Sequence, residues 1–253
     1  MTDLSVHALS VAATPATAYR PLAETSDPAA LDLARLVAAA GGPPVGEQLL
    51  LPVDPATDVA ARALTALLTL GRPVGDEPLF LVRSGPARDH AVAELGRLVH
   101  DFDWPGAELG LTHLDELGGL LAPRLLDWAI EDRATVLLCD DPTLTARAHP
   151  RPAHAVALRV RRGPGPLRLL DSGEGPPPAG LPGTPLTGTG PCDSWLALAA
   201  ALAGGQLATG ERLLMHTRGP HREGWLALAA TDPATLRFAP APRPTAQPVG
   251  SPA

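Results

Sequence analysis

Compact apolar runs alternate with amphipathic segments along this chain, and that alternation limits the folds open to it. Residues 77–85 and 134–140 are short apolar runs that end at Gly or Asp, which is typical of buried strands. Segments between such runs, for example 87–100, carry apolar residues at helical spacing. Strands joined by helices in this order indicate an α/β layered domain.

Proline and glycine mark the boundaries of the expected elements. The expected helices are 29–41, 54–71, 87–100, 116–131 and 193–203, and the expected strands are 77–85, 109–114, 134–140, 155–163, 167–171, 211–217 and 225–230. The segment 173–191 is rich in both residues and is expected to be irregular.

One helix–strand unit occurs twice in the sequence. Glu116 lies 20 residues before Val136, and Asp193 lies 20 residues before Leu213. Each acidic residue begins an expected helix, and each partner lies in the apolar strand that follows. Helix–strand repetition is common in α/β proteins and need not indicate duplication. An internal duplication would also produce the matched spacing, so both interpretations stay open.

The basic residues are all arginine, and this composition excludes several catalytic and binding mechanisms. The chain has 20 arginines, no lysine and no asparagine. Without lysine there is no Schiff-base catalysis and no phosphate-loop lysine, and no mechanism that needs an asparagine side chain can operate. Lys, Asn and Ile have AT-rich codons, so their scarcity indicates a GC-rich genome, with an actinobacterial source as the expectation.

Charge, size and cysteine content narrow the class of protein. The net charge of −7 argues against nucleic acid as the main partner. The 253 residues are 45% hydrophobic, without a run of membrane-spanning length or a basic leader, so a cytoplasmic location is expected. Cys139 and Cys192 are too few for a four-thiolate zinc site and are expected to be free thiols. We expect no metal and no cofactor.

The C-terminal third carries a recognisable order of motifs. Gly188-Thr189 is followed by a small-residue helix through Leu196–Leu202, the segment Gly210–Leu214 and a strand that begins near Trp225. This order resembles the end of ketoacyl-ACP synthase III, a member of the thiolase superfamily. The segments DVAARALTALLTLGRPVGDEPLFLVRSG and LTHLDELGGLLAPRLLDWAIEDRATVLLCDD resemble the middle of the same family.

The resemblance implies a thiolase-like α/β layered fold with two pseudo-duplicated halves. It covers residues 29–232, with a first half of about 29–145 and a shortened second half of about 150–232. Residues 1–28 are then expected to form an N-terminal extension. Residues 239–253 are expected to form a disordered, proline-rich tail.

All three catalytic positions of the family look altered in this chain. The resemblance puts the nucleophilic cysteine, at the start of a buried helix, onto Glu116 or within one residue of it. The catalytic histidine belongs to the segment shortened between Asp171 and Gly188, which contains no His. The catalytic asparagine aligns with Thr189.

These departures imply a non-catalytic partner or accessory subunit in polyketide or fatty-acid biosynthesis. Such a subunit is expected to form a dimer with itself or with an intact ketosynthase, and acyl carrier protein or acyl-CoA are further candidate partners. Chain-length factors of the same superfamily are the analogy for this role.

Other functions stay open. A rebuilt site around Glu116 with His113 or His216 implies an acyltransferase or thioester hydrolase. A protein that kept only the pocket would be an acyl- or pantetheine-binding module. Glu116 also has a simpler interpretation, because a carboxylate at a helix N-terminus complements the helix dipole.

Arg159, Arg161 and Arg162, with Arg168 nearby, form the one dense cationic cluster singled out in the sequence. The cluster is a candidate docking site for an acidic acyl carrier protein or a coenzyme A phosphate. A solvated strand-and-turn face is the alternative interpretation.

Overall fold

Residues 3–21, 28–39, 50–52, 54–83, 89–141 and 151–242 are described by the computed structural model. Among them, ten strands form one mixed sheet of order β5-β4-β6-β7-β1-β8-β11-β10-β9, with β12 beside β1. The strands of this sheet are β1 Leu4–Thr14, β4 Leu79–Arg83, β5 Glu108–Leu111, β6 Arg133–Asp140, β7 Ala153–Arg162, β8 Leu167–Glu174, β9 Thr184–Gly188, β10 Glu211–Arg218, β11 Glu223–Ala230 and β12 Arg237–Pro240.

The helices and a small second sheet complete the described part of the chain. The α-helices are α1 Pro28–Ala39, α2 Val59–Thr69, α3 Asp89–Asp101, α4 Gly118–Ala129 and α5 Asp193–Ala203. Strands β2 (Tyr19–Pro21) and β3 (Leu50–Pro52) form a separate two-stranded sheet. No helix among the described residues is both long and apolar enough to span a bilayer.

The helix that the sequence predicts over 54–71 is two separate pieces. A short 3-10 turn, Pro55–Thr57, comes first, with the Asp54 carboxylate accepting a hydrogen bond from the Ala56 N–H. The α-helix α2 then begins after Asp58, whose side chain accepts from the Ala61 N–H as an N-cap.

β1 lies in the middle of the large sheet and corrects the predicted domain boundary. It pairs with β7 along its whole length, and the side chains of Leu4, Val6 and Leu9 are buried. Leu4–Thr14 therefore belong to the folded core and not to an N-terminal extension. The sequence LSVHALSVAAT hides this strand because both faces are buried, so polar and apolar residues do not alternate.

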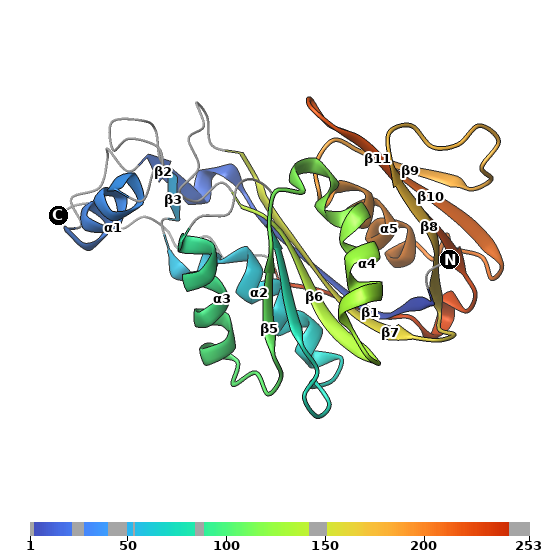
Figure 1. Cartoon of the computed structure of the whole chain (residues 1–253), viewed down its shortest axis with the longest axis horizontal. Helices are drawn as coiled ribbons and strands as arrows, with labels where there is room; N and C mark the ends of the chain where they lie inside the picture. Colours follow the sequence, from blue (N-terminus) through green and yellow to red (C-terminus); the bar gives the residue numbers. More distant parts are fainter. Residues whose placement is uncertain are drawn as a thin grey trace.

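Two helices lie between the two arms of the bent sheet. Figure 1 shows α4 and α5 with β4, β6 and β7 on one side and β8, β10 and β11 on the other. The larger hydrophobic cluster fills this layer, and Trp195 of α5 is fully buried there. On the opposite face of the first arm, α2 packs against β1, β6 and β7 over a second cluster.

The two arms repeat one topology, as the predicted pseudo-duplication requires. The order β5-β4-β6-β7-β1 in the first arm corresponds to β9-β10-β11-β8 in the second, with α4 joining β5 to β6 and α5 joining β9 to β10. The directions of the paired strands also correspond. The second arm has no counterpart of β4 among the described residues, because β9 pairs directly with β10. The second half is thus shortened by a strand.

Two segments expected to be irregular contain strands. β9 lies inside 173–191, where Thr184–Gly188 pair in parallel with β10 despite two glycines and two prolines between 180 and 185. At the C-terminus, Ala239 and Pro240 belong to β12, which pairs with β1. The rest of the predicted tail from residue 243, like most of the loop 142–154, lies outside the described residues.

The contact between α4 and α5 depends on a proline inside α4. Pro123 has no N–H, so the Gly119 carbonyl loses its usual helical donor four residues on. The Trp195 indole N–H of α5 donates to that carbonyl at 2.8 Å instead. Gly119 is also the only residue type that fits, since an added Cβ would overlap the Pro191 carbonyl oxygen.

We expect Trp195→Phe to lower the free energy of unfolding by about 1–3 kcal/mol, because it leaves the buried Gly119 carbonyl without a donor. In a Pro123→Ala background the alanine N–H can serve that carbonyl, so the same substitution should cost less. Urea unfolding of the parent chain, the two single variants and the double variant measures the coupling between Trp195 and Pro123.

Trp104→Phe is the matched control, because the Trp104 indole also donates to a backbone carbonyl, that of Glu77, at 2.8 Å. The hydrogen bond to the Glu77 carbonyl does not involve Pro123. The effects of Trp104→Phe and Pro123→Ala on the free energy of unfolding should therefore be additive. Additivity of Trp195→Phe with Pro123→Ala would contradict the interpretation.

Candidate functional site

The N-terminal ends of α4 and α5 meet at one end of the helix layer. The chain enters α4 through the turn after β5, where His113 and Asp115 have φ angles of 63° and 46°. Two non-glycine residues in the left-handed region within three positions mark a strained strand-to-helix turn. Strain of this kind is frequent at functional sites, so this turn is a candidate functional site.

Glu116 follows the strained turn and lies against the β10–β11 hairpin. Its side chain occupies the space beside Gly219, where an added Cβ would overlap the Glu116 Cγ. The Glu116 Oε2 atom is buried and has no hydrogen-bond partner among the described residues. A carboxylate oxygen in this state is costly, and such atoms in folded proteins call for a specific explanation.

Arg222 is the cation nearest to this turn, and sequence reasoning missed it. Its guanidinium donates to the Glu174 carboxylate at 2.9 Å and to the His113 carbonyl at 3.1 Å. The hydrogen bond to Glu174 and the nearby charges of Asp115 and Glu116 raise the pKa of Arg222. Arg222 thus ties the hairpin to the strained turn. No spacing in the sequence could have linked residues 109 positions apart.

Thr189 and Asp193 form the start of α5. The Asp193 carboxylate accepts from the backbone N–H groups of Thr189 and Gly190, both at 2.8 Å, and from the Thr189 hydroxyl at 3.2 Å. Burial raises the pKa of Asp193, but these hydrogen bonds together lower it by more than burial raises it. The pKa of Asp193 is therefore below its usual value. The hydroxyl of Thr189, the residue that the sequence resemblance places at the family's asparagine, is therefore used to order its own turn.

His216 does not face the helix layer. Its neighbour Thr217 is buried and its hydroxyl lies 3.4 Å from the Ser194 hydroxyl of α5, so the alternation along β10 turns His216 to the other face of the sheet. There the His216 Nε2 lies 2.8 Å from a Glu223 carboxylate oxygen, and this hydrogen bond lowers the pKa of Glu223. The structure therefore separates His216 from the Glu116 turn. The side chain of His113 is exposed and contacts Thr112.

Both thiols are buried. Cys139 and Cys192 are each 1% exposed, and burial raises the pKa of both well above its usual value. Cys192 directly precedes α5, but its sulfur lies near the backbone oxygens of Leu138 and His154. A thiolate is disfavoured at both positions. Among the described residues, no three His, Cys, Asp or Glu side chains gather as metal ligands would.

The predicted arginine cluster is divided by the sheet. Arg159 is 4% exposed and pairs with the buried Glu77 at 3.1 Å, and Arg162 pairs with the Asp127 carboxylate at 2.9 Å. Arg159 is too buried to contact a docked partner, so the docking prediction is wrong for it. The Arg162 side chain is about a third exposed, and docking there stays a prediction. Arg161 has no acidic partner within the described part of the chain.

Comparison with solved structures identifies the fold. No family model and no curated protein sequence matches the chain. Among structures, ChlB3, described as an acyltransferase, matches with a TM-score of 0.59 and 13% identity over 92% of this chain and 99% of its own. A variant of OleA from Xanthomonas campestris gives 0.58 and 12% over 90% and 98%. The 3-oxoacyl-(acyl carrier protein) synthase III of Xanthomonas oryzae pv. oryzae gives 0.56 and 12% over 90% and 98%.

This chain has the thiolase fold. The thiolase-like layers and the two corresponding arms explain the repeated helix–strand unit in the sequence, since α4 with β6 and α5 with β10 are the equivalent pieces. The strained turn before α4 is then the position that the sequence resemblance assigns to the nucleophile.

We expect neither thiol of the native protein to react with Ellman's reagent at pH 8 on the time scale of minutes, because both are buried and protonated. Both should react after unfolding in urea, which gives the total count. Rapid modification of either cysteine in the folded chain would contradict the burial described above.

Gly219→Ala should lower the free energy of unfolding by about 1–3 kcal/mol, because the new methyl group overlaps the Glu116 side chain. Glu116→Ala in the same chain should recover much of the loss. Gly96→Ala is the control, since nothing lies within 4 Å of its added Cβ in α3, and a helical alanine is favourable. Equal costs of Gly219→Ala with and without Glu116 would show that the two side chains are not in contact.

Proposed function

We propose that this chain is a non-catalytic, ketosynthase-III-like partner in the biosynthesis of acyl chains. The observation that carries the proposal is Glu116, a carboxylate packed against Gly219 at the strained turn where the resemblance expects a nucleophilic thiol. A carboxylate there cannot form the acyl thioester on which condensation depends.

The surroundings of Glu116 support the same reading. The two cysteines are buried with raised pKa values, Thr189 is bonded to Asp193, and His216 lies on the far face of its strand. The turn itself contains no cysteine and no asparagine, and its one histidine, His113, is exposed and contacts Thr112. Several matching structures are described as acting on acyl groups, including OleA with bound lauric acid and lauroyl-CoA, which supports the substrate class.

The edge strand β5 is the surface on which we expect the partner to dock. Among the described strands β5 pairs only with β4, and Leu109 within it is 45% exposed. A short exposed edge can be extended by a strand from a second chain. β5 also leads directly into the strained turn, so a partner bound there would lie beside Glu116. An intact ketosynthase, or a second copy of this chain, would fit this edge.

Co-expression with a complete ketosynthase from the same source tests the proposal. We expect the two chains to co-purify and the rate or product chain length of the ketosynthase to change. Leu109→Asp should abolish co-purification, because it places a charge in the shared sheet. Leu125→Asp is the matched control, since Leu125 is a leucine of similar exposure, 44%, on α4. No co-purification and no effect on the ketosynthase would overturn the partner role.

An acyltransferase or thioester hydrolase remains the alternative, because the Glu116 Oε2 atom has no hydrogen-bond partner among the described residues. Intact-mass measurement after incubation with acyl-CoA and acyl carrier substrates distinguishes the two. We expect no adduct and no turnover. A covalent adduct, or turnover lost in Glu116→Gln, would overturn the non-catalytic proposal in favour of a rebuilt active site. Binding without turnover, unchanged in Leu109→Asp, would favour an acyl- or pantetheine-binding module over the partner role.

A further inference from the structure

The two arms of the sheet differ in what covers their outer faces. On the first arm, α2 packs against β1, β6 and β7. The corresponding strands of the second arm are β8, β10 and β11, and the helices in extensive contact with them, α4 and α5, lie on the inner face (Figure 1). Within the described residues, the position equivalent to that of α2 is therefore not occupied by a helix.

The spacing of the repeated helix–strand unit identifies equivalent residues in the two arms. Val136 of β6 corresponds to Leu213 of β10, because each lies 20 residues after the acidic residue that begins its unit. Thr135 therefore corresponds to Arg212. Residues that pair across neighbouring strands point to the same face of a sheet, so the equivalence extends along rows of paired residues.

One such row lies under the end of α2 and has its equivalent in the second arm. In the first arm the row takes one residue each from β6, β7 and β1: Thr135, Arg159 and Ala8. In the second arm it takes the corresponding residues of β10, β11 and β8: Arg212, Ala229 and Arg168. The two rows have exchanged their arginines, with one in the centre of the first row and two at the sides of the second.

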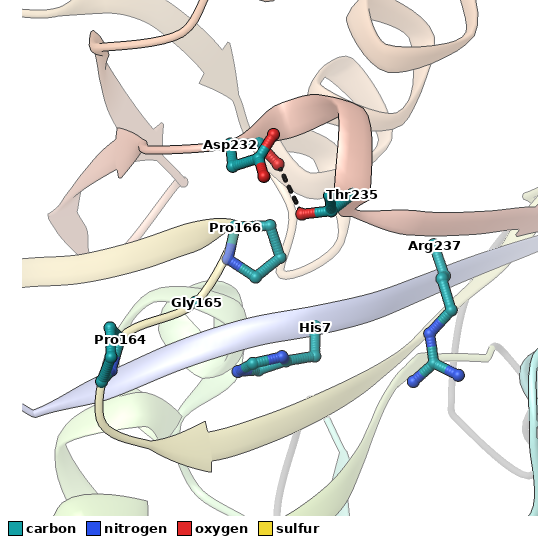
Figure 2. A pocket seen from close by; sticks show the side chains of 7 residues that line it. All are labelled: His7, Pro164, Gly165, Pro166, Asp232, Thr235 and Arg237. Carbon is teal, nitrogen blue, oxygen red and sulfur yellow. Dashed lines mark hydrogen bonds between the residues drawn. The ribbon is translucent and has the colours of Figure 1, made fainter.

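In the first arm, arginines hold the end of α2. The Arg159 guanidinium donates to the Arg72 backbone carbonyl at 2.9 Å, and that of Arg237 donates to the Leu70 backbone carbonyl at 2.6 Å. Figure 2 shows the Arg237 side chain directed away from the turn that precedes β8. The last carbonyls of a helix have no donors within the helix, and a nearby cation also complements the helix dipole.

In the second arm, the equivalent row carries two arginines and no helix end. Apolar neighbours of all three residues belong to the inner hydrophobic cluster, so alternation turns Arg168, Ala229 and Arg212 to the outer face. Neither arginine forms an ion pair with a carboxylate in the described part of the chain. Their Cα atoms lie about 10 Å apart, on either side of Ala229, because neighbouring strands are about 4.8 Å apart. This separation is close to the diameter of an α-helix.

Exposure of the side chains also shows that this position is open. Leu137 of β6 is fully buried, whereas its equivalent in the second arm, Leu214 of β10, is half-buried. Thr135 is likewise fully buried, whereas Arg212 is exposed. The far end of the position is filled, since Trp225 of β11 on the same face is 6% exposed. The open end is the one with the arginines, where the first arm holds the end of α2.

We propose that Arg168, Arg212, Leu214 and Ala229, the second-arm patch, bind the C-terminal end of an α-helix of a partner protein, with carboxylates in its last turn. The helix end packs on Leu214 and Ala229. The two guanidinium groups bind its last carbonyls and its carboxylates, as two arginines bind the end of α2. Neither Glu116 nor β5 enters this argument, so this proposal and the proposed function can fail separately.

Titration of the full, isotope-labelled chain with a peptide of the α2 sequence, residues 58–71, tests the proposal, because α2 occupies the equivalent position in the first arm. The peptide carries Thr69→Glu, which adds a carboxylate to its last turn. We expect saturable NMR shifts of the Arg212, Leu214 and Ala229 amides, with a Kd of about 0.1–1 mM, because so short a peptide is only partly helical before it binds. Shifts confined to other strands, or equal affinity for a scrambled peptide, would overturn the proposal.

Single variants test the two arginines. Arg168→Gln and Arg212→Gln should each weaken binding of the peptide by about fivefold, because each removes a charged donor. Arg20→Gln, the same change at an exposed position of β2, is the control for net charge and should bind as the parent chain does. Unchanged binding in both variants of the patch, or an equal loss in the control, would contradict the assignment.

A charge reversal makes the test independent of folding defects. In a chain with Arg168→Glu and Arg212→Glu, a peptide with Thr69→Lys should bind more tightly than the peptide with Thr69→Glu, which is the reverse of the order in the parent chain. A damaged structure would not reverse this order, and the proposal is wrong if the order stays the same. Tighter binding of a short single-stranded DNA than of the Thr69→Glu peptide by the parent chain would also overturn it, in favour of a nucleic acid.

Discussion

The structure depends on the close approach of α4 and α5 inside the bent sheet. Each arm of the sheet needs a hydrophobic layer to cover its inner face, and one pair of helices serves both arms. The helices can approach only because Gly119 has no side chain, and the Trp195 indole supplies the hydrogen bond that Pro123 withholds. This contact fixes the N-terminal ends of both helices, and through them the Glu116 turn and the Thr189 turn.

The sequence predicts the elements whose pattern is local. α5 has the predicted bounds, and the strands β6, β7 and β10 fall within two residues of theirs, because each contains a compact apolar segment. β1 and β9 escape prediction for different physical reasons. β1 carries Ser5 and Ser10 among its buried positions, so its strand character comes from the strands paired with it on either side. β9 carries glycine and proline before it, so its strand character comes from pairing with β10.

The candidate site follows the same division. The position of Glu116 is visible from the sequence, since a strand, a short turn and a small-residue helix succeed one another there. Its surroundings are not, because Gly219 and Arg222 come from a hairpin about a hundred residues away. The arginine cluster shows the opposite error. Alternation along β7 sends Arg159 and Arg162 to different faces, where each meets its own carboxylate, so adjacency in sequence did not mean a shared surface.

The direct pairing of β9 with β10 shows how this sheet topology accommodates one strand fewer in the second arm. In the first arm the neighbouring strands β5, β4 and β6 all run in the same direction. If the middle strand of such a set is missing, the outer two are still parallel and can pair directly, as β9 and β10 do. The handedness of the helical connection between the two strands is the same whether the helix passes over one strand, as α4 does, or over none, as α5 does. A sheet of this topology can therefore lack the middle strand of its parallel set, because the two strands on either side of it pair directly and satisfy each other's backbone hydrogen bonds.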